Sequence, residues 1–195
     1  MDWIFALLLG YALGSVPFGL LITRLAGAGD LRSIGSGNIG ATNVLRTGRK
    51  GLAAATLLLD LLKGLAAVLI ASRFLPEWTW LAALGAFVGH CFPVWLGFKG
   101  GKGVATTAGI AFGLAWPVGL AYAVTWIGLL LTVRISSVAG MTAAVVAPIA
   151  ALLLGRHDAA GVLAIIALLV LFQHRENLAR LRAGTEPRVG SGKKP

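Results

Sequence analysis

Residues 51–75 read GLAAATLLLDLLKGLAAVLIASRFL, a run of 25 residues that carries only three charged side chains. About 20 apolar residues are enough for an α-helix to cross the hydrocarbon of a bilayer. We therefore predict an all-α fold, a polytopic membrane helix bundle of about seven transmembrane helices. The other runs that support this prediction are 3–26, 78–98, 104–115, 116–134, 137–155 and 158–173.

The composition of the whole chain agrees with a membrane protein. Of its 195 residues, 57% are apolar and 12% are charged, whereas a soluble domain carries about 25% charged residues. The run 104–115 is too short to cross the bilayer upright. It is either a half-helix or continuous with 116–134, which leaves six spans as the alternative. The single cysteine, Cys91, allows no internal disulfide.

Lysine and arginine residues are distributed unevenly between the two sides of such a bundle. With seven spans, 14 of the 17 lie in or beside the loops 27–50, 99–103 and 134–136 and in the C-terminal tail. Only Arg73 and Arg156 fall on the opposite side. Because basic loops stay in the cytoplasm, we expect the N-terminus outside and the C-terminus inside. Six spans would put the basic tail outside, against this rule.

The expected domain organisation is simple. Residues 1–183 should form one integral-membrane domain, and residues 184–195 should be a disordered cytoplasmic tail. The net charge of +10 follows from basic loops rather than from a basic folded surface, which argues against a nucleic-acid partner. The basic tail suits contact with anionic membrane lipid.

The first of three polar segments in this apolar chain is GSGNIGATN at 35–43. Residues 35–40 match the GxGxxG pattern of dinucleotide-binding folds, but that motif needs a preceding strand, which is not predicted here. Glycines let a backbone approach a ligand closely, and hydroxyl, amide and guanidinium groups bind phosphate. The alternative is a flexible connector. The candidate ligand-binding residues are Ser36, Gly37, Asn38, Thr42, Asn43 and Arg46.

The second polar segment is KGGKGVATT at 99–107. It is not a P-loop, since Leu96 and Gly103 stand where that motif needs a glycine and a hydroxyl residue. Successive glycine amides can form an anion-binding nest, and a helix that begins just after them would add its N-terminal amides. The alternative is that the lysines only anchor the loop at the membrane surface. The candidates are Gly100, Gly101, Lys102, Gly103 and Thr106.

The third polar segment is QHREN at 173–177, which ends the last span. At helical spacing His174 and Asn177 share one face, and a histidine there can hydrogen-bond a phosphate or titrate near neutral pH. The alternative is a simple helix cap. Elsewhere, His90 and Cys91 alone are too few ligands for a zinc site, so we expect no metal and no cofactor.

Two opposite charges, Asp60 and Lys63, lie one helical turn apart inside the span 51–75. A charged group at the bilayer centre costs about 2.5–3.5 kcal/mol. We therefore expect the two side chains to pair and to face the protein interior. The pattern does not decide whether the pair is a packing contact between helices or a support for the polar site.

Together these segments resemble one known family, the bacterial acyl-phosphate-dependent glycerol-3-phosphate acyltransferases. The resemblance rests on SVPFG at 15–19, GSGNIGATN at 35–43, FKGGKGVAT at 98–106 and HREN at 174–177, in matching order from residue 3 to about residue 186. It implies transfer of a fatty acyl group from acyl phosphate to the 1-hydroxyl of glycerol 3-phosphate. The products would be lysophosphatidic acid and phosphate, in the first step of phospholipid synthesis.

The resemblance also implies an enzyme of the bacterial inner membrane, with the soluble enzyme that makes acyl phosphate as a candidate partner. No general base is evident, but acyl phosphate is already activated, so positioning and charge stabilisation can carry catalysis. We expect Lys102, Arg46 and His174 at the catalytic centre, facing the cytoplasm. A transporter for a phosphorylated solute is the alternative. It is disfavoured because no paired interrupted helices are evident near the midplane.

Overall fold

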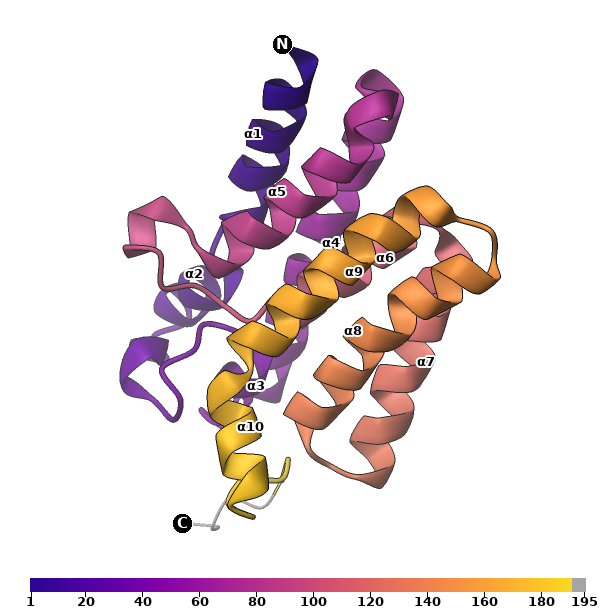
Figure 1. Ribbon diagram of the computed structural model, residues 1–195. Helices are drawn as coiled ribbons and strands as arrows, with labels where there is room; N and C mark the ends of the chain where they lie inside the picture. The colour runs from indigo at the N-terminus through magenta and orange to yellow at the C-terminus, as the bar shows by residue number, and fades with distance from the viewer. Residues whose placement is uncertain (191–195) are drawn as a thin grey trace.

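The computed structural model describes residues 1–190, and none of these residues lies in a β-strand. Seven apolar helices stand side by side and make up most of the molecule (Figure 1). The all-α prediction is thus confirmed for this part of the chain. These helices are α1 (Asp2–Gly14), α4 (Lys50–Phe74), α5 (Thr79–Cys91), α6 (Val104–Leu114), α7 (Trp116–Thr132), α8 (Ser136–Leu153) and α9 (His157–Gln173).

Three short helices gather at the lower end of the bundle in Figure 1, opposite the end at which α1 begins. They are α2 (Phe18–Leu25), α3 (Ala41–Leu45) and α10 (Arg175–Arg182). The remaining elements are single 3-10 turns in the connections, namely η1 (Leu31–Ser33), η2 (Pro76–Trp78) and η3 (Val94–Leu96). All three predicted polar segments therefore reach the same end of the molecule.

The predicted span 3–26 is broken into two helices. α1 ends at Gly14 and α2 begins at Phe18, with Pro17 between them. Proline has no backbone N–H and disfavours helical geometry in the residue before it. The predicted span therefore consists of two helices rather than one, although Asp2–Leu25 as a whole is long and apolar enough to cross a bilayer. The break turns α2 into a short surface helix that buries Gly19, Leu20 and Thr23.

By length and composition, four segments of the described chain could cross a bilayer: Asp2–Leu25, Lys50–Phe74, Pro76–Leu96 and Ser136–Leu153. The pair α9 and α10 becomes a fifth if it is counted as one span despite its 58° bend. Helices α6 and α7 are separate but shorter. The count of seven spans and the orientation of the termini remain predictions.

Small residues bring the helices into close contact. A Cβ atom on Gly10 or Gly14 of α1 would collide with the backbone of Ala82 or Ala86 on α5. In the same way, Gly64 of α4 lies against the backbone of Thr106 on α6. Close backbone approach through small residues is typical of helices that pack within a membrane.

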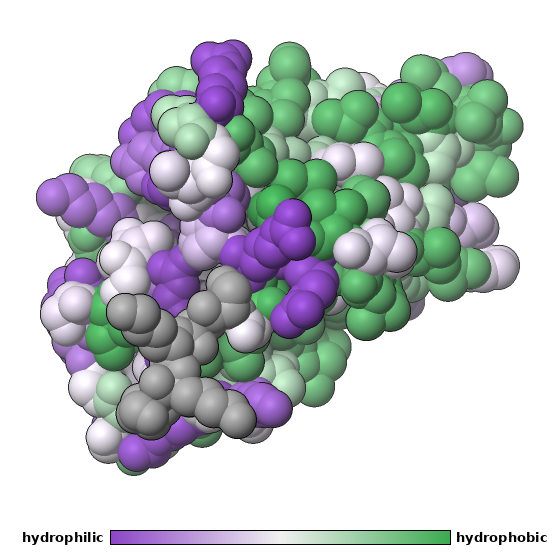
Figure 2. Space-filling view, turned by 90° about the horizontal axis from the view of Figure 1, so that it is seen from below, coloured by the Kyte–Doolittle hydropathy of each residue, from purple (hydrophilic) through white to green (hydrophobic). Residues whose placement is uncertain are grey.

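The outer surface of the bundle is largely apolar. Exposed apolar side chains include Phe5 (72% exposed), Leu131 (75%) and Leu168 (68%), which lie on three different helices. Viewed from below, hydrophilic residues gather on one part of the molecule while hydrophobic residues cover the rest (Figure 2). An exposed apolar surface of this extent suits contact with lipid.

Candidate functional site

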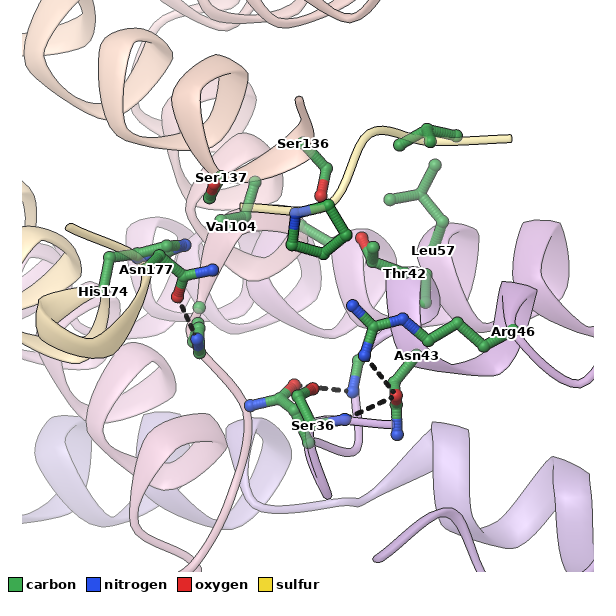
Figure 3. A pocket seen from close by; sticks show the side chains of 18 of the residues that line it. Ser36, Thr42, Asn43, Arg46, Leu57, Val104, Ser136, Ser137, His174 and Asn177 are labelled. Atoms are coloured by element: carbon green, nitrogen blue, oxygen red, sulfur yellow. Dashed lines mark hydrogen bonds between the residues drawn. The ribbon is translucent and has the colours of Figure 1, made fainter. Parts of the chain in front are cut away.

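A pocket opens at the polar end of the bundle, where segments far apart in the sequence meet. It lies between α3, the N-terminus of α6, the N-terminus of α8 and the junction of α9 with α10 (Figure 3). Nine of the predicted site residues line it. They are Ser36, Asn38, Thr42, Asn43, Arg46, Lys102, Gly103, His174 and Asn177.

Asn43 organises the α3 side of the pocket. Its side chain is buried, and its Nδ2 donates to the carbonyl oxygens of Leu31 and Ile34, both at 2.9 Å. Its Oδ1 accepts from the Ser36 amide and from an Arg46 nitrogen, both at 3.3 Å. The carboxamide is therefore occupied by its own loop. We predicted Asn43 as a substrate contact, but here it shapes the loop and holds Arg46.

Ser36, Thr42 and Arg46 are the exposed members of this side, and Figure 3 shows all three beside the pocket. Asn38 closes a tight turn, since its Oδ1 accepts from the Gly40 amide at 2.9 Å. Gly37 does not line the pocket. It has φ +68°, a left-handed conformation that favours glycine, so it allows the loop to turn.

The loop before α6 presents Lys102 on the opposite side. The amides of Gly100 and Gly101 donate to the carbonyl oxygens of Cys91 and His90, each at 3.0 Å. Since these amides are occupied, the anion nest that we predicted from them is not formed. The loop is instead fixed to the end of α5, and Lys102 Nζ donates to Asn177 Oδ1.

The N-terminus of α6 still faces the pocket, because Gly103, Val104 and Ala105 all line it. The first amides of a helix have no partner within the helix and favour anions. Thr106 lies elsewhere: it is fully buried and packs on Gly64 of α4. The predicted contact between Thr106 and a substrate is therefore not supported by its position.

His174 occupies the bend between α9 and α10, beyond the end of the apolar helix. Its Nδ1 lies 2.7 Å from the carbonyl oxygen of Val170. Because a carbonyl only accepts, Nδ1 carries the proton and Nε2 keeps a free lone pair. Burial, together with the charge of Lys102, lowers the pKa of His174 to about 4. The ring is thus neutral at neutral pH and contributes no fixed positive charge.

Fixed positive charge comes from other side chains. Arg46, Lys102, Arg180 and Arg188 line the pocket. Burial, followed by the charge of Arg180, lowers the pKa of Lys102. A phosphate bound here would raise the pKa of Lys102, since a nearby negative charge stabilises the ammonium form.

Several pocket residues were not among the predicted site residues. Glu186 is the clearest case, since its carboxylate accepts hydrogen bonds from Ser137, Asn177 and Arg180. We expected disorder over 184–195. Of this segment, residues 186–189 line the pocket, and residues 191–195 lie outside the described residues. The available signal was that Glu186 is the one acidic residue in a basic tail.

Asp60 and His90 also line the pocket, from α4 and α5. Asp60 Oδ1 lies 2.7 Å from Lys63 Nζ and 3.7 Å from His90 Nδ1. These three side chains are buried. Their cluster supports the Lys102 loop, because the His90 ring packs so closely on Gly101 that a Cβ there would collide with it. Among the described residues, no group of three or more His, Cys, Asp or Glu side chains could hold a metal ion.

Cations and hydroxyl groups line a pocket at the polar end of an apolar bundle, an arrangement typical of an integral membrane protein that binds a phosphorylated molecule. The family model described as glycerol-3-phosphate acyltransferase matches residues 4–184. The chain therefore belongs to the glycerol-3-phosphate acyltransferase family, as the sequence motifs predicted.

Relatives named glycerol-3-phosphate acyltransferase match over nearly their whole length. The protein from Erythrobacter litoralis is 62% identical over 191 residues, covering 98% of this chain and 97% of the relative. The protein from Mesorhizobium japonicum is 61% identical over 188 residues, covering 96% of each.

Solved structures agree with the fold. The crystal structure of PlsY (YgiH), an integral membrane glycerol 3-phosphate acyltransferase, in its glycerol 3-phosphate form superposes with a TM-score of 0.92. It is 37% identical to this chain, with 98% of this chain and 97% of that chain covered. The lysophosphatidic acid form of the same protein gives a TM-score of 0.90 at 36% identity. The prediction of a multi-pass membrane helix bundle is thereby confirmed.

Proposed function

We propose that this chain transfers a fatty acyl group from acyl phosphate to the 1-hydroxyl of glycerol 3-phosphate. The products are lysophosphatidic acid and inorganic phosphate. The observation that carries the proposal is the placement of Arg46 and Lys102 on opposite sides of one pocket, with the N-terminus of α6 beside Lys102. Such an arrangement offers each of two phosphate groups its own cation.

The reaction needs few groups from the protein. The 1-hydroxyl oxygen attacks the acyl carbonyl carbon, a new ester C–O bond forms, and the C–O bond to phosphate breaks. The phosphate leaves with the electron pair of that bond. Arg46 and Lys102 stabilise the negative charge that gathers on the phosphates, which is the main contribution that fixed charges make to such a reaction.

The hydroxyl proton has two acceptors within this arrangement, a substrate phosphate oxygen or His174 Nε2. Because the pKa of His174 is about 4, the ring is a weak base and accepts a hydrogen bond more readily than a full proton. The substrate phosphate, which titrates nearer neutral pH, is therefore the assigned acceptor. His174 orients the hydroxyl.

The apolar surface and the basic loops support a cellular location and an orientation for the protein. The protein lies in the bacterial inner membrane with its pocket toward the cytoplasm, where both phosphorylated substrates occur. The acyl chain lies among the apolar helices while its phosphate sits in the pocket. The soluble enzyme that makes acyl phosphate is the proposed partner at this surface.

The test is a reconstitution with defined substrates. Protein purified in detergent is mixed with acyl phosphate and glycerol 3-phosphate, and both lysophosphatidic acid and released phosphate are measured. Equal formation of the two products is expected. Uptake of glycerol 3-phosphate into sealed vesicles, without chemical change, would instead favour a transporter and reject the proposal.

A further inference from the structure

Residues 185–190, here called the strap, extend along the pocket just beyond the part of the chain that the family model matches. The far end of the strap is fixed to the loop between α7 and α8. There the Val189 amide donates to the Arg134 carbonyl oxygen at 2.7 Å, and an Arg134 guanidinium nitrogen donates to the Val189 carbonyl oxygen at 3.1 Å. The strap therefore runs from the end of α10 to the loop that precedes α8.

The near end of the strap is held by Glu186, whose side chain is only 6% exposed. Its Oε1 accepts from Ser137 Oγ at 2.6 Å and from Asn177 Nδ2 at 2.5 Å, and its Oε2 accepts from Arg180 Nε at 2.7 Å. Burial alone would raise the pKa of this carboxyl group, but these three donors together hold it below its usual value. Glu186 is therefore ionised at neutral pH.

The carboxamide of Asn177 connects this carboxylate to Lys102. Its nitrogen donates to Glu186, and its oxygen accepts from Lys102 Nζ. The two ends of a carboxamide differ, one being a donor and the other an acceptor. Lys102 and Glu186 therefore favour the same orientation of Asn177, with its oxygen toward the ammonium group and its NH2 group toward the carboxylate. Without Glu186 the NH2 group loses this acceptor, and the Asn177 side chain is fixed from one end only.

Glu186 also limits the repulsion between two cations. Arg180 is paired with Glu186, and its charge lowers the pKa of Lys102. Loss of the carboxylate would leave Arg180 unpaired beside the pocket. The orientation of Asn177 and the charge of Arg180 therefore both act on the position and protonation of the Lys102 ammonium group.

We infer that Glu186 is a positioning residue for Lys102, acting through Asn177, and that the strap is a functional part of the phosphate site. What this positioning means for catalysis rests on the proposed function. Phosphate binding, however, can be measured without any turnover, so the two can fail separately.

Four proteins test the inference: Glu186→Ala, Glu186→Gln, a chain that ends at Gly184 and a chain that ends at Gly190. The last keeps every strap contact described above and is the matched control. For each protein the dissociation constant of inorganic phosphate is measured by calorimetry in detergent. The KM and kcat for acyl transfer are measured alongside.

Loss of one charge-assisted hydrogen bond corresponds to a change of about tenfold in an equilibrium constant. We expect Glu186→Ala and the chain ending at Gly184 to weaken phosphate binding by about that factor and to raise KM more than they lower kcat. Glu186→Gln keeps an oxygen acceptor and should recover part of the loss. The chain ending at Gly190 should match the wild type.

Unchanged phosphate binding in Glu186→Ala would overturn the inference. So would a lower melting temperature and lower kcat with unchanged phosphate binding and KM, because that pattern belongs to a merely structural contact. If the wild type binds phosphate but transfers no acyl group, the proposed function fails, while the binding series still decides the role of Glu186.

Discussion

Lys63 Nζ lies 2.7 Å from Asp60 Oδ1 inside α4, and it also donates to the Val16 carbonyl oxygen at 2.8 Å. Both side chains are less than 5% exposed. The carbonyl of Val16 lies at the break between α1 and α2, where Pro17 interrupts the helix. One ammonium group thus neutralises a buried carboxylate and adds a second donor to a backbone oxygen at the break, which also accepts from the Phe18 amide at 3.1 Å.

Removing one partner of this pair should be more harmful than removing both charges. Lys63→Met leaves the buried Asp60 carboxylate with His90, 3.7 Å away, as its one remaining basic neighbour among the described residues, and removing one partner of a buried ion pair costs about 3–5 kcal/mol. The double variant Asp60→Asn/Lys63→Met carries no charge there and should be more stable than Lys63→Met alone. Thermal unfolding in detergent measures this, with the single variant Asp60→Asn completing the cycle. Strictly additive effects would show that the two side chains do not interact.

Gly101 should tolerate no side chain, because a Cβ atom there collides with the His90 ring. Gly101→Ala should displace Lys102, and a displacement of about 1 Å costs about 100-fold in rate. The matched control is Gly128→Ala in α7, where a Cβ meets open space. The double variant His90→Ala/Gly101→Ala restores room at this contact and should recover part of the activity. A fully active Gly101→Ala enzyme would refute the proposed support of Lys102.

Stability should depend on pH through His174. Its ordinary pKa is 6.5, and burial lowers the pKa in the folded protein to about 4. Between these values the unfolded chain binds a proton that the folded chain does not, so stability is full above pH 6.5 and decreases as the pH falls toward 4. This pKa shift corresponds to about 3 kcal/mol of folding free energy.

The measurement for His174 is the melting temperature in detergent from pH 4 to pH 7, for the wild type and for His174→Gln. The variant cannot titrate at this position, so its melting temperature should fall less steeply toward low pH. Identical slopes in the two proteins would mean that His174 is not held neutral by its surroundings.

Sequence patterns predicted the parts of this molecule that depend on local composition. Apolar runs indicated the helices, and glycine, hydroxyl and basic residues indicated which segments meet at the pocket. The patterns were less informative about which polar groups are already hydrogen-bonded within the protein, because these bonds depend on the path of the backbone. The amides of Gly100 and Gly101 are occupied by carbonyl oxygens at the end of α5, and Asn43 is occupied by its own loop. Hydrogen bonds of this kind cannot be predicted from the spacing of residues in the sequence.

The contacts of Asp60 and Glu186 show a second limit. Asp60 was expected to pair with Lys63 because they are one turn apart, but its neighbour His90 is 30 positions away and is brought close only by the packing of α4 and α5. Glu186 was assigned to a tail that we expected to be disordered. Its partners Ser137, Asn177 and Arg180 are identified only once α8 and α10 are in place.

The central claim is that Arg46 and Lys102, 56 positions apart in the sequence, act together on substrate phosphates. The most direct test is the rate of acyl transfer by purified Arg46→Ala and Lys102→Ala, with the exposed Lys99→Ala as the control. Loss of a group that stabilises transition-state charge costs about 100-fold or more. We expect a loss of that size in both variants, with folded protein in detergent and normal activity in Lys99→Ala. Wild-type rates in Arg46→Ala and Lys102→Ala would contradict the account.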